Sequence, residues 1–599
     1  MKSSPTSAFA VLLLVVVALG LRLGPIDHGM PRGYVPDNHV VRSALGMARD
    51  KDPIPPAGKY STYPYLVPYV LLPVYASQYA LGKVAGDWQT SDEFGARVME
   101  DPGLVQVPAR IVMALFGAAT AWALFAAARA AGLGLGAWIA AWLSATCLLN
   151  VQLSTHERPW VVVVFFGALS LASALRFAAA GRTRSLLWSG VWAGLGFASH
   201  QAGLVLLALP ACAWLAVAAP WGWLGPVGGG GPADPASREA LPRRRIGSQI
   251  GLGALCVALF VLAGLVCGHA YYLRYGAVAQ EQVVGGALAA DKLSIGGQAV
   301  ALGLSFDSAQ RLSGALFGYD PVLLVLGLLG ILAARGRADA ATHRTRLGVN
   351  LGLLLIGGFF FFNPSDHVRY LLPVCMLLAL PAGAFAERLL ALCGSGGGRT
   401  LMGLLLLVPL VQALRLDWLL GQEDTRAVAE RELDALPAGA RVAIDHYGPT
   451  PDLSRAALAR IGELRELYRR EGHRLAVLES GADSGLDAIG VEELFEIDPD
   501  THEYVVRGAA RALGERPRDV LAVLGITHLL EVDRRPRPGG NSWLAALAQA
   551  GETLAVIDPS SGTRPPAEAF LPTEMDFPLT GLWQVKRPGP WMRLVELAD

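Results

Sequence analysis

Charged residues are scarce in this chain, and their scarcity argues against a protein that is soluble throughout. They make up 17% of the 599 residues, whereas ordinary soluble domains contain about 25%. Basic and acidic residues are equal in number, 50 of each, so the net charge at pH 7 is zero. The chain lacks the excess of basic residues that is typical of nucleic-acid-binding proteins, and we predict no nucleic-acid partner.

Cysteine is also rare, and its placement excludes two common uses. Five of the six cysteines lie in apolar runs and one lies just beyond such a run: Cys147, Cys212, Cys256, Cys267, Cys375 and Cys393. No pair has the spacing of a structural zinc site, and the set does not form a disulfide framework. We interpret them as small buried apolar residues and predict no metal site from them.

Long apolar runs, by contrast, are abundant. Hydrophobic residues make up 53% of the chain, and runs of about 18 or more can cross a ~30 Å hydrocarbon core. The predicted spans are 7–24, 107–129, 133–151, 159–180, 186–200, 201–221, 248–273, 319–335, 347–363, 368–387 and 400–420. We therefore predict a polytopic α-helical membrane protein with about eleven spans, the first retained as a helix rather than cleaved as a signal peptide.

The apolar stretch 63–81 is ambiguous because it contains three prolines and many tyrosines. If it does not span, the arginine-rich loops near 182–184, 238–245 and 335–346 all fall on the side of Lys2. Positive residues favour the cytoplasmic side. We therefore predict that 63–81 is interfacial or re-entrant, with a cytoplasmic N-terminus.

This topology leaves two large external regions. The first is a loop of about residues 25–106 with interfacial helices, and the second is everything after about residue 420. We predict a membrane domain over 1–420 and a soluble α/β domain over 421–599, with strands at 441–445, 474–478, 520–523 and 528–532 and a helix at 453–470.

Polar residues gather on the external side of the predicted spans. Asp37 follows the first span, at a position suited to a catalytic base and also to a solvated charge. Glu157 lies in a short ionisable loop with His156 and Arg158, and His200 divides two later spans. Arg369 begins another span, where a charge must snorkel or bind a partner such as a phosphate.

Five short motifs resemble the GT-C superfamily of integral-membrane glycosyltransferases, in particular bacterial relatives of protein O-mannosyltransferases and lipid A aminoarabinose transferases. They are Pro36-Asp37-Asn38, Tyr63-Pro64-Tyr65-Leu66, His156-Glu157-Arg158-Pro159, the stretch Trp192–His200, and Arg369-Tyr370-Leu371-Leu372-Pro373. Two departures are visible, because family members often have Glu where Asn38 stands and Asp where Glu157 stands.

The resemblance implies a hexosyl- or pentosyltransferase with a polyprenyl-phosphate-linked donor, acting with inversion on the external face of a bacterial inner membrane. The implied catalytic residues are Asp37, as the base, and Glu157. The donor phosphate would face Arg369, Lys59 or Arg158. The implied substrate-binding residues are His39, Tyr63, His156, His200 and Tyr370. The acceptor would be a protein, a lipid or a polysaccharide of the cell envelope.

Cofactors and rival functions stay open at this point. Asp37 and Glu157 offer hard oxygen ligands, so a divalent cation is an alternative to metal-independent transfer. A lipid or glycan transporter would show mid-span charges or inverted repeats, and the sequence shows few of the former and no clear repeat. A non-catalytic scaffold with an external binding domain would not need Asp37.

Overall fold

The computed structural model describes most of the chain from Pro5 to Leu597. The residues outside the description are 1–4, 33, 35–37, 62, 219–245, 277–291, 296–297, 302, 334–339, 365–366, 394–395, 446–447, 466–484, 498–503, 507–509, 533–541, 561–578 and 598–599. The chain divides into two compact units. The helical unit comprises Met1–Ile26, Asp37–Ala80 and Val107–Leu414, and the C-terminal unit comprises Asp27–Pro36, Leu81–Gln106 and Arg415–Asp599.

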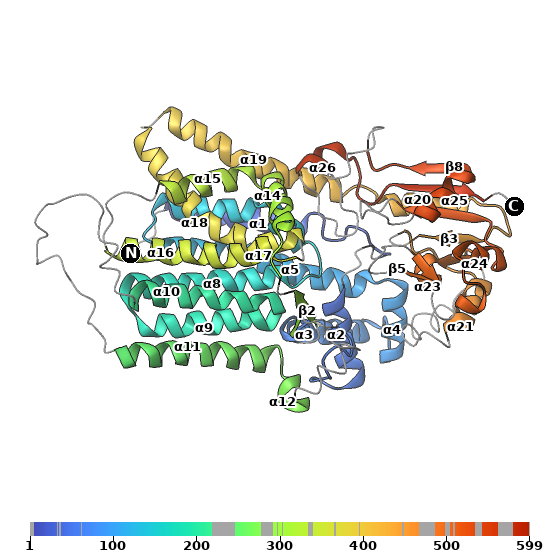
Figure 1. Ribbon diagram of the computed structural model, residues 1–599, viewed down its shortest axis with the longest axis horizontal. Helices are drawn as coiled ribbons and strands as arrows, with labels where there is room; N and C mark the ends of the chain where they lie inside the picture. Colours follow the sequence, from blue (N-terminus) through green and yellow to red (C-terminus); the bar gives the residue numbers. More distant parts are fainter. Residues whose placement is uncertain are drawn as a thin grey trace, which may run out of the picture. The chain divides into compact units, whose positions relative to one another are not determined.

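Helices dominate the first of these units (Figure 1). The helices that contribute to it are α1 (Pro5–Leu23), α2 (His39–Asp50), α3 (Leu66–Ala85), α5 (Gly103–Ala130), α6 (Leu135–Thr146), α7 (Leu148–Ser154), α8 (Trp160–Ala180), α9 (Thr183–Ser199), η1 (Gln201–Leu207), α10 (Ala208–Ala218), α11 (Ile246–Cys267), α12 (Tyr271–Tyr275), α14 (Phe306–Tyr319), α15 (Pro321–Leu332), α16 (Ala340–Gly352), η4 (Leu353–Gly357), α17 (Gly358–Phe362), η5 (Val368–Leu371), α18 (Leu372–Leu392) and α19 (Gly397–Leu420). The short strands β1 (Lys292–Ile295) and β2 (Gln298–Ala301) pair antiparallel.

The predicted class, a polytopic helical membrane protein, is confirmed. Seven helices of the described residues are long and apolar enough to span a membrane, and two bent pairs raise the number to nine. The bends are 50° between α6 and α7 and 111° between α14 and α15. The predicted spans 7–24 and 186–200 are also helices, α1 and the 17-residue α9. Helices suit a lipid environment because their backbone polar groups are satisfied within the segment.

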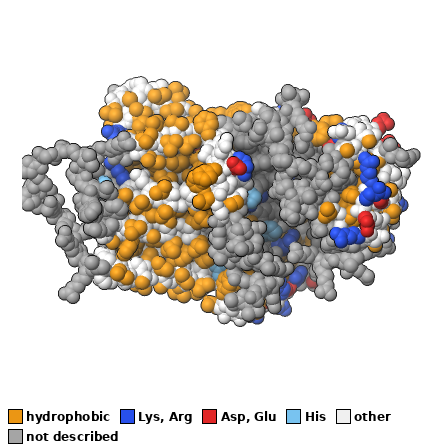
Figure 2. Space-filling view, in the orientation of Figure 1, with side chains coloured by type: hydrophobic (Ala, Val, Ile, Leu, Met, Phe, Trp, Pro, Cys, Tyr) orange, Lys and Arg blue, Asp and Glu red, His pale blue; other side chains and the backbone are white. Residues whose placement is uncertain are grey.

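Hydrophobic side chains cover much of the helical unit in Figure 2. The large apolar side chains exposed on α11 and α19 include Ile250, Leu255, Val257, Leu262, Val266, Leu401, Leu404, Leu407 and Val411. Exposure of so large an apolar area favours contact with lipid. The central helices α8 and α18 are instead buried over 78% of their apolar windows.

Glycine allows α6 and α18 to approach closely. A Cβ atom on Gly383 would lie 2.3 Å from the carbonyl oxygen of Gly136, and one on Gly136 would lie 2.5 Å from that of Gly383. Small residues at helix crossings let backbones pack tightly in membranes. The two helices therefore meet backbone to backbone at Gly136 and Gly383.

The stretch 63–81 largely coincides with α3, which is not among the apolar spans identified in the described chain. Before this helix, the Tyr65 amide donates to the carbonyl of Gly268 at 2.8 Å, and the Tyr65 hydroxyl donates to Pro55 and Pro56 at 3.0 Å. Tyr65 and Tyr271 rings lie 5.4 Å apart. These contacts attach the first loop to the end of α11.

The C-terminal unit contains a five-stranded mixed sheet in the order β4-β3-β7-β9-β8. Its strands are β3 (Val442–Ile444), β4 (Ala488–Gly490), β7 (His528–Val532), β8 (Glu552–Ile557) and β9 (Met592–Glu596), and β5 (Phe495–Ile497) pairs separately with β6 (Tyr504–Val506). The interior strand β3 runs parallel to both of its neighbours, β4 and β7, and is fully buried. Burial on both faces is typical of parallel strands covered by helices.

Helices cover the sheet in two groups. Side chains of α21 (Arg455–Arg465), α24 (Pro517–Val523) and α25 (Ser542–Ala550) share one apolar core, and α20 (Thr425–Asp434) contributes to another. The remaining helices of the unit are α4 (Ser91–Glu100), α23 (Val491–Leu494), η6 (Ala510–Ala512) and α26 (Leu579–Gln584). The predicted α/β character is confirmed, and so are the strands near 441–445 and 528–532.

Other predicted elements had different outcomes. The predicted strand 520–523 is wrong, because these residues end α24, whose first turn begins with Pro517. Proline suits the first helical position, and a short apolar run alone does not distinguish a buried helix from a strand. The predicted strand 474–478 lies outside the described residues. Of the predicted helix 453–470, the described part is α21.

The two compact units are not contiguous in sequence. Segments 27–36 and 81–106 group with residues 415–599 in the C-terminal unit. Polar contacts explain the first of these. Arg32 forms ion pairs with Glu430 and Asp452 at 3.1 and 2.8 Å, and the Tyr34 hydroxyl donates to Glu430 at 3.0 Å. Apolar patterning along the sequence does not indicate such long-range contacts.

Candidate functional site

Aromatic rings from five separate segments meet within the helical unit. His39, at the start of α2, lies 5.5 Å from Tyr63, and Tyr63 lies 5.1 Å from His200, measured between ring centroids. Trp160, the first residue of α8, lies 4.5 Å from His200 and 5.2 Å from Tyr370. We call these five residues the aromatic cluster. All of them except Trp160 were predicted as substrate-binding residues.

His200 is the centre of this cluster, and its tautomer is defined by its neighbours. It ends α9 in an extended conformation, and its Nδ1 accepts the amide hydrogen of Ala202 at 3.0 Å. Burial, together with the positive charge of Arg369, lowers the pKa of His200 to about 3. The ring is therefore neutral at physiological pH, with its proton on Nε2, which makes that atom a hydrogen-bond donor.

Arg369 lies beside the cluster on η5, the short turn that leads into α18. Its guanidinium carbon is 5.9 Å from the centroid of the Tyr370 ring, and its side chain is partly exposed. Tyr370 also contacts His367 and Phe360, at 5.4 and 5.5 Å. A cation at the edge of a ring-lined site is suited to an anionic group of a ligand whose apolar or sugar part contacts the rings.

Glu157 is close in sequence to Trp160 but is closed to solvent. Its Oε1 accepts from Nε of Arg110 at 2.9 Å, and both side chains have an exposed fraction of 0%. Arg110 also donates from Nη1 to the carbonyl of Ile26 at 3.0 Å. This ion pair therefore links the end of α1 to α5 and to the loop before α8. The carboxylate is paired and closed to solvent in this structure, and its catalytic role stays a prediction.

The neighbours of Glu157 are buried as well. Nδ1 of His156 donates to the carbonyl of Gln152 at 2.7 Å, which caps the end of α7. Burial, with the charges of Arg158 and Arg110, lowers the pKa of His156 to about 3. Arg158 has an exposed fraction of 3%. Arg158 was predicted to face a donor phosphate and His156 to bind substrate; the structure places both side chains in the interior of the loop.

Lys59 was predicted as a phosphate contact, and it lies in a surface ion pair. Its Nζ is 2.6 Å from Oδ2 of Asp50, and its side chain is 40% exposed. Tyr60 also donates to Asp50. Hydrogen bonds from Arg49, Lys59 and Tyr60 hold the pKa of Asp50 well below its usual range. The ammonium group is thus engaged by a carboxylate of the same loop.

Asp37 lies outside the described residues. The described residue Asn38 precedes the first turn of α2, and His39, two positions after Asp37, belongs to the aromatic cluster. Two residues of the site were not predicted from sequence, namely Trp160 and Arg110. A signal for Arg110 was available, because a lone arginine inside an apolar run is costly unless it is paired.

Part of the helical unit also matches a known protein family in sequence. Residues 94–225 match the family model described as dolichyl-phosphate-mannose-protein mannosyltransferase. The matched segment contains Arg110, Glu157, Trp160 and His200. The predicted resemblance to the GT-C superfamily of membrane glycosyltransferases is confirmed. Among curated proteins, no sequence matches the chain significantly.

Solved structures with a similar course of the chain include three glycosyltransferases. The apo form of ArnT from Cupriavidus metallidurans is 17% identical, with 80% of this chain and 74% of that chain covered and a TM-score of 0.44. The oligosaccharyltransferase of Archaeoglobus fulgidus, tethered to an acceptor peptide, is 11% identical, with 88% and 69% covered and a TM-score of 0.46. The mycobacterial arabinofuranosyltransferase AftD is 14% identical, with 100% and 42% covered and a TM-score of 0.42.

Proposed function

We propose that this protein transfers a hexose or pentose from a polyprenyl-phosphate-linked donor to an acceptor on the external face of a bacterial inner membrane. The observation that carries the proposal is the meeting of His39, Tyr63, His200 and Tyr370 beside Arg369. Rings with hydrogen-bonding edges suit a sugar, and an arginine suits the phosphate that carries it. The lipid part of the donor would lie along the apolar helices.

The reaction needs a base, a stabilised leaving group and a positioned donor. In the proposed step, the acceptor O–H or N–H attacks the anomeric carbon while its proton passes to the carboxylate of Asp37. The bond from that carbon to the phosphate oxygen breaks, and polyprenyl phosphate leaves with the electron pair. Attack from the opposite face inverts the anomeric centre. Arg369 would stabilise the charge that develops on the departing phosphate.

Glu157 has a different role in this proposal from the one first predicted. Because it is committed to Arg110 within the interior, we assign it to positioning the start of α8, and with it Trp160, rather than to the chemistry. The same ion pair makes Glu157 unsuited to an open metal site, so we derive no step through a cation there. A divalent cation in this proposal would depend on Asp37.

The experiment compares four strains at matched expression: a deletion, and the deletion complemented with wild type, with Asp37→Asn, or with Asp87→Asn. Asp87 is an exposed acid of the first loop and serves as the control. Mass spectrometry of surface glycans, glycoproteins and lipids should show a sugar that is lost on deletion. Wild type and Asp87→Asn should restore it, and Asp37→Asn should not.

Two results would count against the proposal. Restoration of the sugar by Asp37→Asn would exclude Asp37 as the base. If deletion changes no glycan but alters the distribution of a lipid across the membrane, the transporter becomes the better interpretation.

A further inference from the structure

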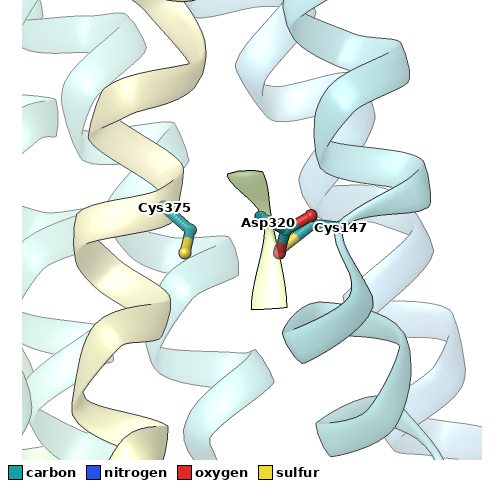
Figure 3. Close-up of side chains that lie close together, drawn as sticks. All are labelled: Cys147, Asp320 and Cys375. Carbon is teal, nitrogen blue, oxygen red and sulfur yellow. The ribbon is translucent and has the colours of Figure 1, made fainter. Parts of the chain in front are cut away.

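Two cysteines and an aspartate, far apart in sequence, meet inside the helical unit (Figure 3). Cys147 lies at the break between α6 and α7, Asp320 lies at the break between α14 and α15, and Cys375 lies in the first turn of α18. Their sulfur and oxygen ligand atoms all lie within 4.8 Å of one another. Figure 3 shows the Cys375 thiol directed from one side toward Asp320 and Cys147.

All three side chains are closed to solvent, with exposed fractions of 2%, 2% and 3% for Cys147, Asp320 and Cys375. The described partners of the carboxylate are weak donors. The Cys147 thiol donates to Oδ2 at 3.1 Å and the Leu148 amide donates to Oδ1 at 3.4 Å. A carboxylate at membrane depth is costly unless a strong partner compensates its charge. The Leu149 amide is a further partner of the carboxylate, but neither a thiol nor a backbone amide carries the positive charge that would compensate it.

We propose that Cys147, Asp320 and Cys375 form a binding site for a thiophilic divalent cation of the zinc type. Zinc accepts this combination of sulfur and carboxylate ligands, with metal–ligand distances of about 2.0–2.3 Å. Tetrahedral coordination at those distances places the ligand atoms roughly 3.5–3.8 Å apart. The observed spacing of 3.1 Å between Cys147 and Asp320, and of up to 4.8 Å overall, therefore requires only small side-chain movements.

The charge balance also favours a divalent ion. On binding, both thiols lose their protons to solvent, so the two thiolates and the carboxylate carry three negative charges. The divalent ion reduces the net charge of the site to −1. This equals the charge of a Cys3His zinc site. A cavity of about 10 Å³ beside the cysteines is lined by Thr120, Ser144 and Asn150, among others. It has room for about one water molecule as a fourth ligand.

The site would hold together two helix breaks and the start of α18, the helix that follows Arg369 and Tyr370. Its expected role is therefore structural, and the proposal does not depend on the transferase activity. The sequence did not indicate it, because zinc sites are recognised by closely spaced ligands, whereas these three lie 173 and 55 residues apart, from 147 to 320 and from 320 to 375.

The test measures metal in the intact purified chain. The protein is expressed in zinc-supplemented medium, purified in detergent through a tag without histidine, and analysed by mass spectrometry of its metal content. We expect about one zinc per chain in wild type, and a loss of at least about five-fold in Cys375→Ser and in Asp320→Asn. The matched control is Cys212→Ser, a buried cysteine outside the cluster, which should retain the metal.

A second measurement protects the test against misfolded variants. Wild type grown with cobalt in place of zinc should show thiolate-to-cobalt charge-transfer absorption, which arises only when sulfur binds the ion. Wild type without bound metal and without this absorption would overturn the proposal. So would metal that persists unchanged in both Cys375→Ser and Asp320→Asn, because the ion would then be bound elsewhere.

Discussion

Arg110 and Glu157 form an ion pair that is fully buried, with Nε and Oε1 2.9 Å apart. The pair joins α5 to the loop before α8, 47 residues later in the chain. Two charges withdrawn from water are tolerated only when each has the other as a partner. The pair thereby ties to α5 the loop that leads into Trp160, the first residue of α8.

Replacement of one member of the pair should be severe. Glu157→Gln removes the carboxylate partner of a buried guanidinium, for which we expect a loss of about 3–5 kcal/mol in the free energy of unfolding. The double variant Arg110→Met with Glu157→Met should lose much less, because neither charge of the pair is then left without the other. Unfolding by heat or denaturant, measured for all variants in the same detergent, gives both losses of stability.

An exposed ion pair of the same unit provides the control. Arg274 and Asp52 are 2.5 Å apart with side chains 49% and 22% exposed, so Arg274→Gln should cost under about 1 kcal/mol. Equal losses for Glu157→Gln and Arg274→Gln would show that burial of the Arg110–Glu157 pair has no special consequence.

The close crossing of α6 and α18 predicts a second effect. Gly383→Ala places a methyl group against the backbone of Gly136, and we expect it to destabilise the protein by about 1–3 kcal/mol. Gly403→Ala on α19 meets nothing within 4 Å and should be neutral or slightly stabilising, because alanine favours helix more than glycine does. Thermal midpoints of the two variants in the same detergent decide this; a normal midpoint for Gly383→Ala would contradict the crossing.

Stability should fall in mild acid through His200. Its folded pKa is lowered to about 3 by burial and by Arg369, whereas an unfolded histidine titrates near 6.5. Above about pH 7 neither state binds the proton, so stability is unaffected. As the pH falls from about 6.5 toward 3, only the unfolded state gains a proton, and stability falls by about 2 kcal/mol at pH 5.

His200→Asn is the matched variant, since its side-chain oxygen can still accept from the Ala202 amide but does not titrate. Its thermal midpoint should therefore depend less on pH between 5 and 7 than that of wild type. Substitution of the exposed His343 by Asn should leave the wild-type dependence in place. Parallel curves for wild type and His200→Asn would refute the assignment.

Arg369 should act on the donor. Loss of a charge-assisted contact to phosphate costs about 1.5–3 kcal/mol, so Arg369→Gln should lower kcat/KM for a polyprenyl-phosphate sugar by roughly 10- to 150-fold without changing the unfolding midpoint. Arg346→Gln, an exposed arginine on α16, is the control and should retain activity. A lowered midpoint with unchanged kcat/KM would instead assign Arg369 a structural role.

Individual motifs located much of the site, but not how its parts combine. Tyr63, His200 and Tyr370 came from three motifs and His39 from the residues after a fourth, spread over more than 300 residues. The structure brings them into one cluster. The same reasoning did not show that Glu157 is buried and paired with Arg110, and its catalytic role stays a prediction. Its state depends on Arg110, whose packing cannot be deduced from spacing.

The sequence by itself determined the helical membrane class and the change to an α/β domain near residue 420, because length, hydropathy and local periodicity are properties of contiguous residues. Tertiary structure alone decided which polar groups are paired, which face the aromatic cluster, and that Cys147 lies beside Asp320 and Cys375. Those relationships depend on how helices pack across long sequence separations, where a glycine such as Gly383 or a break before Pro321 sets the approach. No local pattern contains that information.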